Sequence, residues 1–204
     1  MSFKKLSEVI QTALINAGYE NLTPFQVKAI SSIKAGKDFI GIGPSTLGKS
    51  TSIAIGVLQR LGDATEDDAP RAVIIVPDKV RTLEIEAEFL RLGKRTELRV
   101  VIAHDKGHKV QQRVALYIGS DIVIGTAKRL FEMYLQNGLN LANVQMVIVD
   151  NAEEVLKNGH QTHIMRLKES MKKCQFIMMN NLLTPRIEKA SDLIMFQPSL
   201  IKED

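Results

Sequence analysis

The stretch "GPSTLGKS", residues 43–50, has glycine at its first and sixth positions, followed by lysine and serine. It satisfies the pattern G-x-x-x-x-G-K-[ST], in which backbone amides of a loop point at phosphate oxygens. In such a loop the ammonium of Lys49 would reach the β- and γ-phosphates, and the hydroxyl of Ser50 would bind magnesium. The stretch therefore predicts a loop that binds the phosphates of a nucleotide.

A second chemical signal is the run "VIVDNAEE", residues 147–154, in which an apolar stretch delivers Asp150 and then turns polar. A carboxylate in this position is the acidic partner of magnesium in phosphate-loop enzymes. Ser50 and Asp150 are therefore the predicted magnesium ligands.

The residue after Asp150 decides what chemistry the second signal permits. Many nucleotide-hydrolysing enzymes have a glutamate there that orients the attacking water, but this chain has Asn151. A neutral amide accepts no proton at pH 7, so no catalytic residue is predicted. Glu153 and Glu154 follow, and we expect them to face elsewhere if the chain becomes helical after Ala152.

Short apolar runs separated by segments of helical periodicity must position these residues. Strands that read as continuous apolar runs are buried on both faces, and their alternation with helices indicates a parallel sheet. The helical segments begin near Lys49, Arg81 and Ala127. We predict an α/β three-layer sandwich with a mainly parallel sheet, and strands at residues 38–43, 72–77, 98–104, 121–126, 144–150, 174–180 and 192–196.

Composition limits the classes of protein that fit. The 204 residues, 45% hydrophobic and 25% charged, suit one domain with a core. A net charge of +4 is compatible with nucleic acid but falls short of a dedicated binder. The single cysteine, Cys174, excludes an internal disulfide and indicates a reducing compartment, so we expect a cytoplasmic protein. No stretch approaches the ~20 apolar residues that cross a bilayer, so no membrane partner is expected.

The motifs, in their order, give the chain a family resemblance. "GYENLTPFQ" (18–26) precedes the phosphate loop, and "GTAKRL" (125–130) and "DNAE" (150–153) follow it. Over nearly its whole length the chain resembles the first RecA-like domain of a DEAD-box RNA helicase. In that family the first motif reads adenine, which implies that Gln26 pairs with the base edge and Tyr19 packs on the base. A glutamine amide has the donor and the acceptor that this pairing needs.

The resemblance implies ATP or ADP with Mg²⁺ as cofactors, and single-stranded RNA, a protein partner or a second RecA-like domain as partners. It also implies one RecA-like P-loop NTPase domain over residues 1–204, with a helical Q-motif-like segment at 1–36, a core at 37–204 and no second RecA-like domain. Implied RNA contacts are Lys79, Thr126, Lys128 and Arg129. The implied nucleotide-binding residues are Tyr19, Gln26, Gly43, Ser45, Thr46, Gly48, Lys49, Ser50 and Thr51.

The chain also departs from the family pattern. Thr46 replaces the middle glycine of the phosphate loop, so we expect a reshaped loop. The motif P-T-R-E-L has become "PDKVR" (77–81), which places the carboxylate of Asp78 where a hydroxyl would meet RNA phosphate, and S-A-T has become "NNL" (180–182). These changes affect RNA contact and the coupling of hydrolysis to strand separation.

Three functions fit these residues, and the sequence leaves open whether the chain is an enzyme. The first is a helicase-like domain that binds adenine nucleotide and RNA without ATPase or unwinding activity on its own; the intact Lys49, Ser50, Asp150 and Gln26 favour it. The second is a fragment of an ATP-dependent RNA helicase, active with a second RecA-like domain. The third is a non-enzymatic interaction module that kept only the fold.

Overall fold

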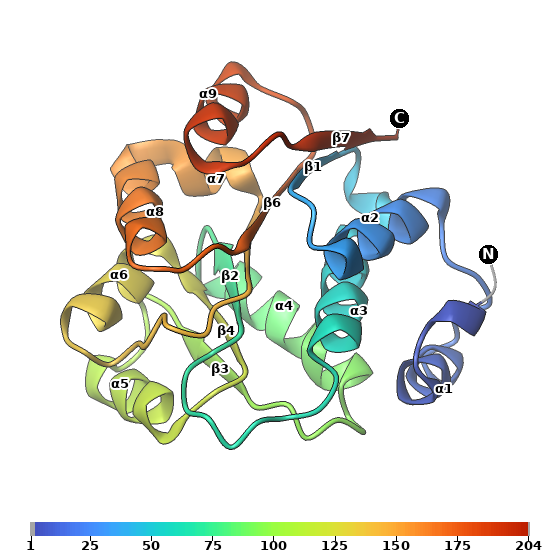
Figure 1. Ribbon diagram of the computed structural model, residues 1–204, viewed down its shortest axis with the longest axis horizontal. Helices are drawn as coiled ribbons and strands as arrows, with labels where there is room; N and C mark the ends of the chain where they lie inside the picture. Colours follow the sequence, from blue (N-terminus) through green and yellow to red (C-terminus); the bar gives the residue numbers. More distant parts are fainter. Residues whose placement is uncertain (1–2, 204) are drawn as a thin grey trace.

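A seven-stranded sheet forms the centre of the protein (Figure 1). The computed structural model describes residues 3–203, so residues 1, 2 and 204 of the predicted domain lie outside the described part. The strand order is β3-β4-β2-β5-β6-β1-β7, and each neighbouring pair is parallel. The strands are β1 Phe39–Ile42, β2 Ala72–Val76, β3 Val100–Ala103, β4 Ile122–Thr126, β5 Met146–Asp150, β6 Gln175–Asn180 and β7 Ser199–Lys202.

Helices cover both faces of the sheet, which confirms the predicted three-layer α/β sandwich. Side chains alternate along each strand, so β2 sends Ile74 to one apolar cluster and Ile75 to the other. The first cluster packs under α1 Glu8–Asn16, α2 Pro24–Ala35, α3 Lys49–Leu61 and α4 Lys79–Leu92. The second packs under α5 Lys109–Ile118, α6 Ala127–Leu135, α7 Ala152–Leu156, α8 His160–Glu169 and α9 Pro185–Ile194. None of the helices in residues 3–203 is long and apolar enough to cross a membrane.

The predicted strand at residues 192–196 is wrong, because most of this segment ends α9. Thr184 caps that helix by accepting a hydrogen bond from the amide of Ile187, and Pro185 occupies its first turn. The buried residues of α9 recur at helical spacing: Ile187, Ala190, Ser191 and Ile194. The last strand lies further on, at Ser199–Lys202, beside β1.

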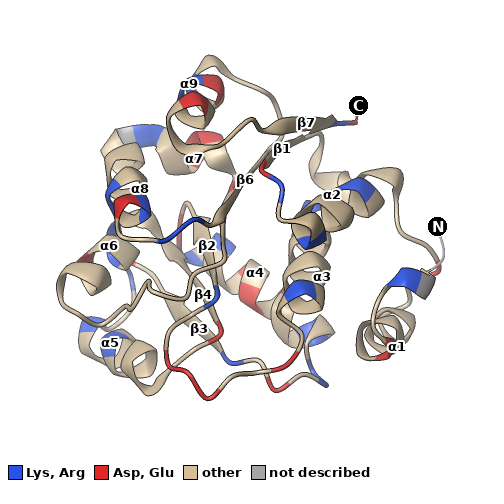
Figure 2. Cartoon of the chain, in the orientation of Figure 1, with Lys and Arg blue, Asp and Glu red and all other residues tan. Residues whose placement is uncertain are grey.

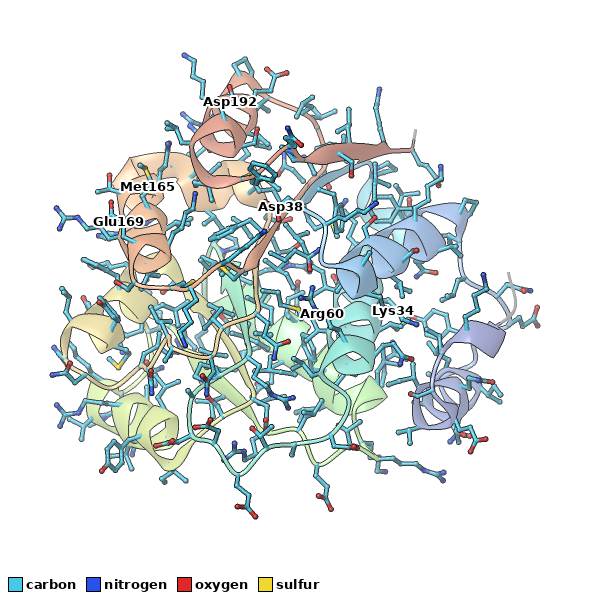
Figure 3. All side chains as sticks on the ribbon, viewed as in Figure 1. Lys34, Asp38, Arg60, Met165, Glu169 and Asp192 are labelled. Carbon is cyan, nitrogen blue, oxygen red and sulfur yellow. The ribbon has the colours of Figure 1, made fainter. Side chains whose placement is uncertain are left out.

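Asp38, the residue before β1, determines the path of the chain after α9. Asp38, labelled in Figure 3, accepts a hydrogen bond from the amide of Phe176 on β6 and another from the amide of Phe196. These two bonds, 2.9 and 2.8 Å long, anchor the chain after α9 next to β1 before it enters β7. A carboxylate distant in sequence therefore sets the path, and the apolar run alone could not reveal it.

A buried carboxylate also holds the acidic loop 62–71 to the sheet; this loop carries the red segments between α3 and β2 in Figure 2. Asp121, immediately before β4, is fully buried and pairs with Arg71 at 2.9 Å and with Arg99 at 3.1 Å. Its oxygens also accept from the amides of Arg99 and Thr65. Burial alone raises the pKa of Asp121, but the bonds from Arg99 and Arg71 outweigh it and lower the pKa.

We expect Asp121→Asn to lower the free energy of unfolding by about 3 kcal/mol at pH 7, because it leaves the buried guanidinium of Arg71 without its counter-charge. Urea denaturation followed by circular dichroism measures this. The control is Asp192→Asn, an exposed change on α9 (Figure 3), which should shift the free energy by no more than about 0.5 kcal/mol. Equal stability of the two variants would contradict the role of Asp121.

The pH dependence follows from the same lowered pKa. A carboxylate whose pKa is depressed by folding stabilises the protein above the pKa of the unfolded chain, about 3.9, and loses that contribution as the pH falls through the folded pKa. The stability difference between the parent and Asp121→Asn should therefore be constant near neutrality and shrink below about pH 4. Denaturation curves at several pH values test this.

Candidate functional site

The predicted phosphate loop joins β1 to α3 at the carboxyl edge of the sheet. Ser45–Leu47 form a single 3-10 turn, and Gly48 then adopts left-handed backbone angles, φ 71° and ψ 38°, directly before α3. The N-terminus of α3 has no side-chain cap. Because the first amides of a helix have no acceptor within the helix, this end of α3 presents donors to an anion.

Two positions of the loop favour glycine. A Cβ atom on Gly43 would lie 2.4 Å from the backbone oxygen of Glu203, and Gly48 has a φ of 71°, which side chains rarely adopt. A Cβ atom on Gly48 would also lie 2.3 Å from Nε2 of Gln26. Thr46, in contrast, lies within the 3-10 turn, and its φ is not among the positive values of the described residues. The β-branched residue is therefore accommodated without backbone strain, in a loop closed by the bond from the Leu47 amide to the Pro44 carbonyl.

Lys49 points back into its own loop. Its ammonium donates to the carbonyl oxygens of Gly43 and Pro44, and to Oδ1 of Asn181 at 2.8 Å. The side chain is buried, and burial lowers the pKa of Lys49; Asp150 opposes this effect and Arg81 adds to it. Asn181, in the stretch "NNL" after β6, is thus a site residue that the sequence prediction missed.

Gln26 and Tyr19 lie close to the loop, but both side chains already have partners within the protein. Gln26 is only 3% exposed, and its oxygen accepts from the amide of Thr23 in a capping box that begins α2. The hydroxyl of Tyr19 lies 3.1 Å from that of Thr51, and the guanidinium of Arg91 lies 5.3 Å from the centre of the Tyr19 ring. Adenine recognition by these two residues stays a prediction.

Thr51 belongs to the scaffold of the site. It is 7% exposed and donates to Oε1 of Glu88 at 2.6 Å, while its hydroxyl also contacts Tyr19. Nucleotide binding by Thr51 stays a prediction, and its hydroxyl already has partners within the protein. The hydroxyl links the segment before α2 to α3 and α4. Ser45 and Thr46 are exposed on the rim of the loop, and they stay predicted contacts.

The structure does bring Ser50 and Asp150 together, but Arg81 lies between them. Nε of Arg81 is 2.6 Å from Oδ2 of Asp150, and Nη2 donates to the hydroxyl of Ser50 at 2.7 Å. Asp150 is fully buried at the end of β5. Burial alone lowers the pKa of Arg81, but the charge and hydrogen bond of Asp150 outweigh it, and the pKa is raised.

A magnesium ion does not fit the position that the sequence predicts for it. Mg²⁺ needs about six oxygen ligands at roughly 2.1 Å. The two protein oxygens expected to hold it, Ser50 Oγ and Asp150 Oδ2, are bonded to the guanidinium of Arg81. Oδ1 of Asp150 is buried and has no hydrogen-bond partner within the described part of the chain, so it is the one oxygen of that carboxylate not bonded to Arg81. In this structure a cationic side chain takes the place predicted for the metal.

Sequence analysis missed Arg81 as a site residue. The signal was present: Arg81 is the last residue of "PDKVR", where the family motif P-T-R-E-L has leucine. A charged residue at an apolar position indicates a changed environment, but only the adjacency of β2 and β5 shows that this environment contains Asp150.

Asn151 has a backbone conformation that suits its residue type. Its φ and ψ are 51° and 52°, in the left-handed region that asparagine enters more readily than most residues. The chain turns here from β5 into α7. As expected, the following carboxylates bond elsewhere: Glu153 accepts from Thr184 at 2.5 Å and pairs with Arg186, and Glu154 pairs with Lys157 at 2.6 Å.

Two of the predicted RNA contacts are used inside the protein. Thr126 is 4% exposed and donates to Asp105 at 3.1 Å. Arg129 is 7% exposed and donates to Oε1 of Gln112 at 2.7 Å and to the carbonyls of Asp105 and Gly107. Both side chains are buried and bond within the protein, and RNA contact by Thr126 and Arg129 stays a prediction.

The other residues of the predicted RNA surface are two exposed lysines and an aspartate that caps a helix. Lys79 and Lys128 are exposed at the starts of α4 and α6 and stay predicted contacts. Asp78 caps α4 by accepting from the amide of Arg81 at 2.8 Å, so its carboxylate has a structural role.

Comparison with known proteins places the chain among helicases. A family model described as DEAD/DEAH box helicase matches residues 23–188. The chain is 29% identical over 191 residues to the probable ATP-dependent RNA helicase DDX46 of Homo sapiens, covering 91% of this chain and 18% of that protein. It is 26% identical to the ATP-dependent RNA helicase eIF4A of Eremothecium gossypii, covering 98% and 51%.

The fold agrees with a solved structure from the same group. A DEAD box protein from the hyperthermophile Methanococcus jannaschii superposes with a TM-score of 0.90 at 24% identity, covering 98% of this chain and 55% of that one. The chain thus spans from about a fifth to about half of the length of these relatives. The match over residues 23–188 shows that the chain belongs to the DEAD/DEAH box helicase family, with the RecA-like fold of its first domain.

Proposed function

We propose that this chain binds an adenine nucleotide through the phosphate loop and does not hydrolyse it on its own. The observation that carries the proposal is the loop itself: the uncapped N-terminus of α3 follows a left-handed Gly48, and the buried ammonium of Lys49 sits inside the loop. Carbonyl oxygens and Asn181 hold that ammonium now, and a phosphate is a stronger partner for it.

Adenine is the base that the neighbouring residues favour. Gln26 lies against Gly48. A glutamine amide has a donor and an acceptor, and the edge of adenine has an acceptor and a donor that can pair with them. Tyr19 is tied to α3 through Thr51, so an aromatic ring is held near the start of the same helix. The relatives' names, which specify ATP-dependent helicases, agree with this choice.

The absence of hydrolysis is proposed from the end of β5. Asn151 cannot accept a proton, and Glu153 and Glu154 are engaged with Thr184, Arg186 and Lys157. Ser50 and Asp150 are bonded to Arg81, so the position of the expected metal is filled. The chain would therefore bind the nucleotide as a ligand and would not use it as a substrate.

Adenine nucleotide should bind to the parent more tightly than guanine nucleotide, and Lys49→Ala should abolish binding, because the loop loses its only buried ammonium among the described lysines. Isothermal titration with ATP, ADP and GTP measures this. Lys189→Ala, an exposed change on α9, is the matched control and should bind like the parent. Equal affinity for ATP and GTP, or no loss in Gln26→Ala, would remove the adenine assignment.

The 204-residue chain should show no ATP turnover above background, and Asn151→Glu alone should not restore it. A missing general base costs about 10²- to 10⁴-fold in rate. An arginine finger, which the family supplies from a second RecA-like domain, contributes about 10³- to 10⁵-fold. Phosphate release is measured with and without single-stranded RNA, with Lys49→Ala as background.

Turnover that RNA stimulates and Lys49→Ala removes would overturn the non-hydrolytic proposal. It would favour the second candidate, a helicase portion that works with further domains. Failure of every nucleotide to bind would instead leave the interaction module that retains only the fold.

RNA binding is proposed to rest on exposed lysines rather than on Arg129. We expect Arg129→Ala to lower the free energy of unfolding by about 2 kcal/mol, because it breaks a buried network of hydrogen bonds. Lys128→Ala should leave stability within about 0.5 kcal/mol, yet lower the log-log salt slope of single-stranded RNA binding by about 0.7 units if it neutralises one phosphate. Loss of RNA affinity in a fully stable Arg129→Ala protein would reverse this assignment.

A further inference from the structure

The guanidinium of Arg81 is held on three sides. Nε bonds to Asp150 at 2.6 Å, Nη1 to Glu84 at 2.8 Å and Nη2 to the hydroxyl of Ser50 at 2.7 Å. The side chain is 20% exposed, and its carboxylate partner on β5 is fully buried. Three directional bonds define one orientation for the planar fork, so this cation is a built part of the site.

The fold delivers the guanidinium to this position. Arg81 lies in the first turn of α4, where Asp78 accepts a hydrogen bond from its backbone amide. α4 follows β2, and β2 pairs with β5, which ends in Asp150. Ser50 comes from the first turn of α3, directly after the phosphate loop. The side chain thus reaches the two residues that the sequence predicts as magnesium ligands.

The charges of the site argue against an additional divalent ion. Arg81 and Lys49 are two cations near the loop, and the charge of the buried Asp150 acts on both. Mg²⁺ placed between Ser50 and Asp150 would displace Arg81 from both bonds and would be repelled by it at short range. A guanidinium, in contrast, can donate two parallel hydrogen bonds to a phosphate, and it carries a positive charge without needing ligands of its own.

We propose that Arg81 is the resident cation of this nucleotide site: it stands in the place of the metal and lets adenine nucleotide bind without a divalent ion. The phosphate next to Ser50 accepts from the guanidinium, which keeps its bond to Asp150. A guanidinium cannot act as a Lewis acid on a bound water, so the same residue supports binding without supporting hydrolysis. This inference rests on the proposed nucleotide binding.

Binding of ADP in EDTA and in excess Mg²⁺ tests the inference, with the parent, Arg81→Leu and Arg95→Leu compared by isothermal titration. Leucine is the residue of the family motif, and Arg95 is an exposed arginine whose removal matches the change in charge. The parent and Arg95→Leu should bind ADP equally well in both buffers. Arg81→Leu should bind weakly in EDTA and about tenfold more tightly with Mg²⁺, a usual size for coupling between two ligands.

A second measurement needs no nucleotide. Arg81→Leu leaves Asp150 buried without its cation, so Mg²⁺ should raise the melting temperature of this variant and leave that of the parent unchanged. If Arg81→Leu does not fold, Arg81→Gln takes its place in both measurements, because its amide reaches the position of Nε and keeps two N–H donors but carries no charge.

The outcomes separate the inference from the proposed function. Equal Mg²⁺ dependence in the parent and in Arg81→Leu would overturn the resident cation while nucleotide binding stands. Tighter binding by Arg81→Leu than by the parent in EDTA would also overturn it, since Arg81 would then obstruct the site. If none of the proteins binds ADP in either buffer, the proposed function fails and this inference fails with it.

Discussion

The parallel pairing of β1, β6, β5 and β2 places the carboxyl ends of these strands along one edge of the sheet. Each strand end then contributes one part of the site: the phosphate loop after β1, Asn181 after β6, Asp150 on β5 and Arg81 after β2. Ligands of open α/β sheets bind at this edge because connections leave the sheet there in opposite directions. The rest of the site depends on that alignment of strands.

One buried ion pair dominates the electrostatics at this edge of the sheet. Asp150 would be costly in the interior without a cation, and Arg81 satisfies one of its oxygens while bonding to Ser50. In the family pattern that position is leucine, which carries no charge. One substitution on α4 therefore changes what the carboxylate on β5 can hold, although Asp150 itself matches the family motif.

Several other motif residues keep their identity but serve the fold. Arg129 and Thr126 bond to the segment 103–112, and Thr51 joins Tyr19 to Glu88. These three side chains are buried, unlike the exposed Lys128 beside Arg129, and they bond to groups within the protein. Matching a motif residue by residue is thus weaker evidence of binding than the surroundings of each side chain.

Local sequence determined much of this protein. The pattern of glycine, lysine and serine at 43–50 predicts a tight phosphate loop before a helix. Continuous apolar runs predict strands that are buried on both faces, as in a parallel sheet. Both predictions depend only on residues that are close together in the sequence. Asn151 likewise offers no general base at its own position, because a neutral amide does not accept a proton at pH 7. The path after α9 escaped prediction because it depends on Asp38, about 160 residues away. Only the tertiary structure decided the role of Arg81, because Asp150 lies 69 residues further along the chain and becomes its neighbour through the pairing of β2 with β5.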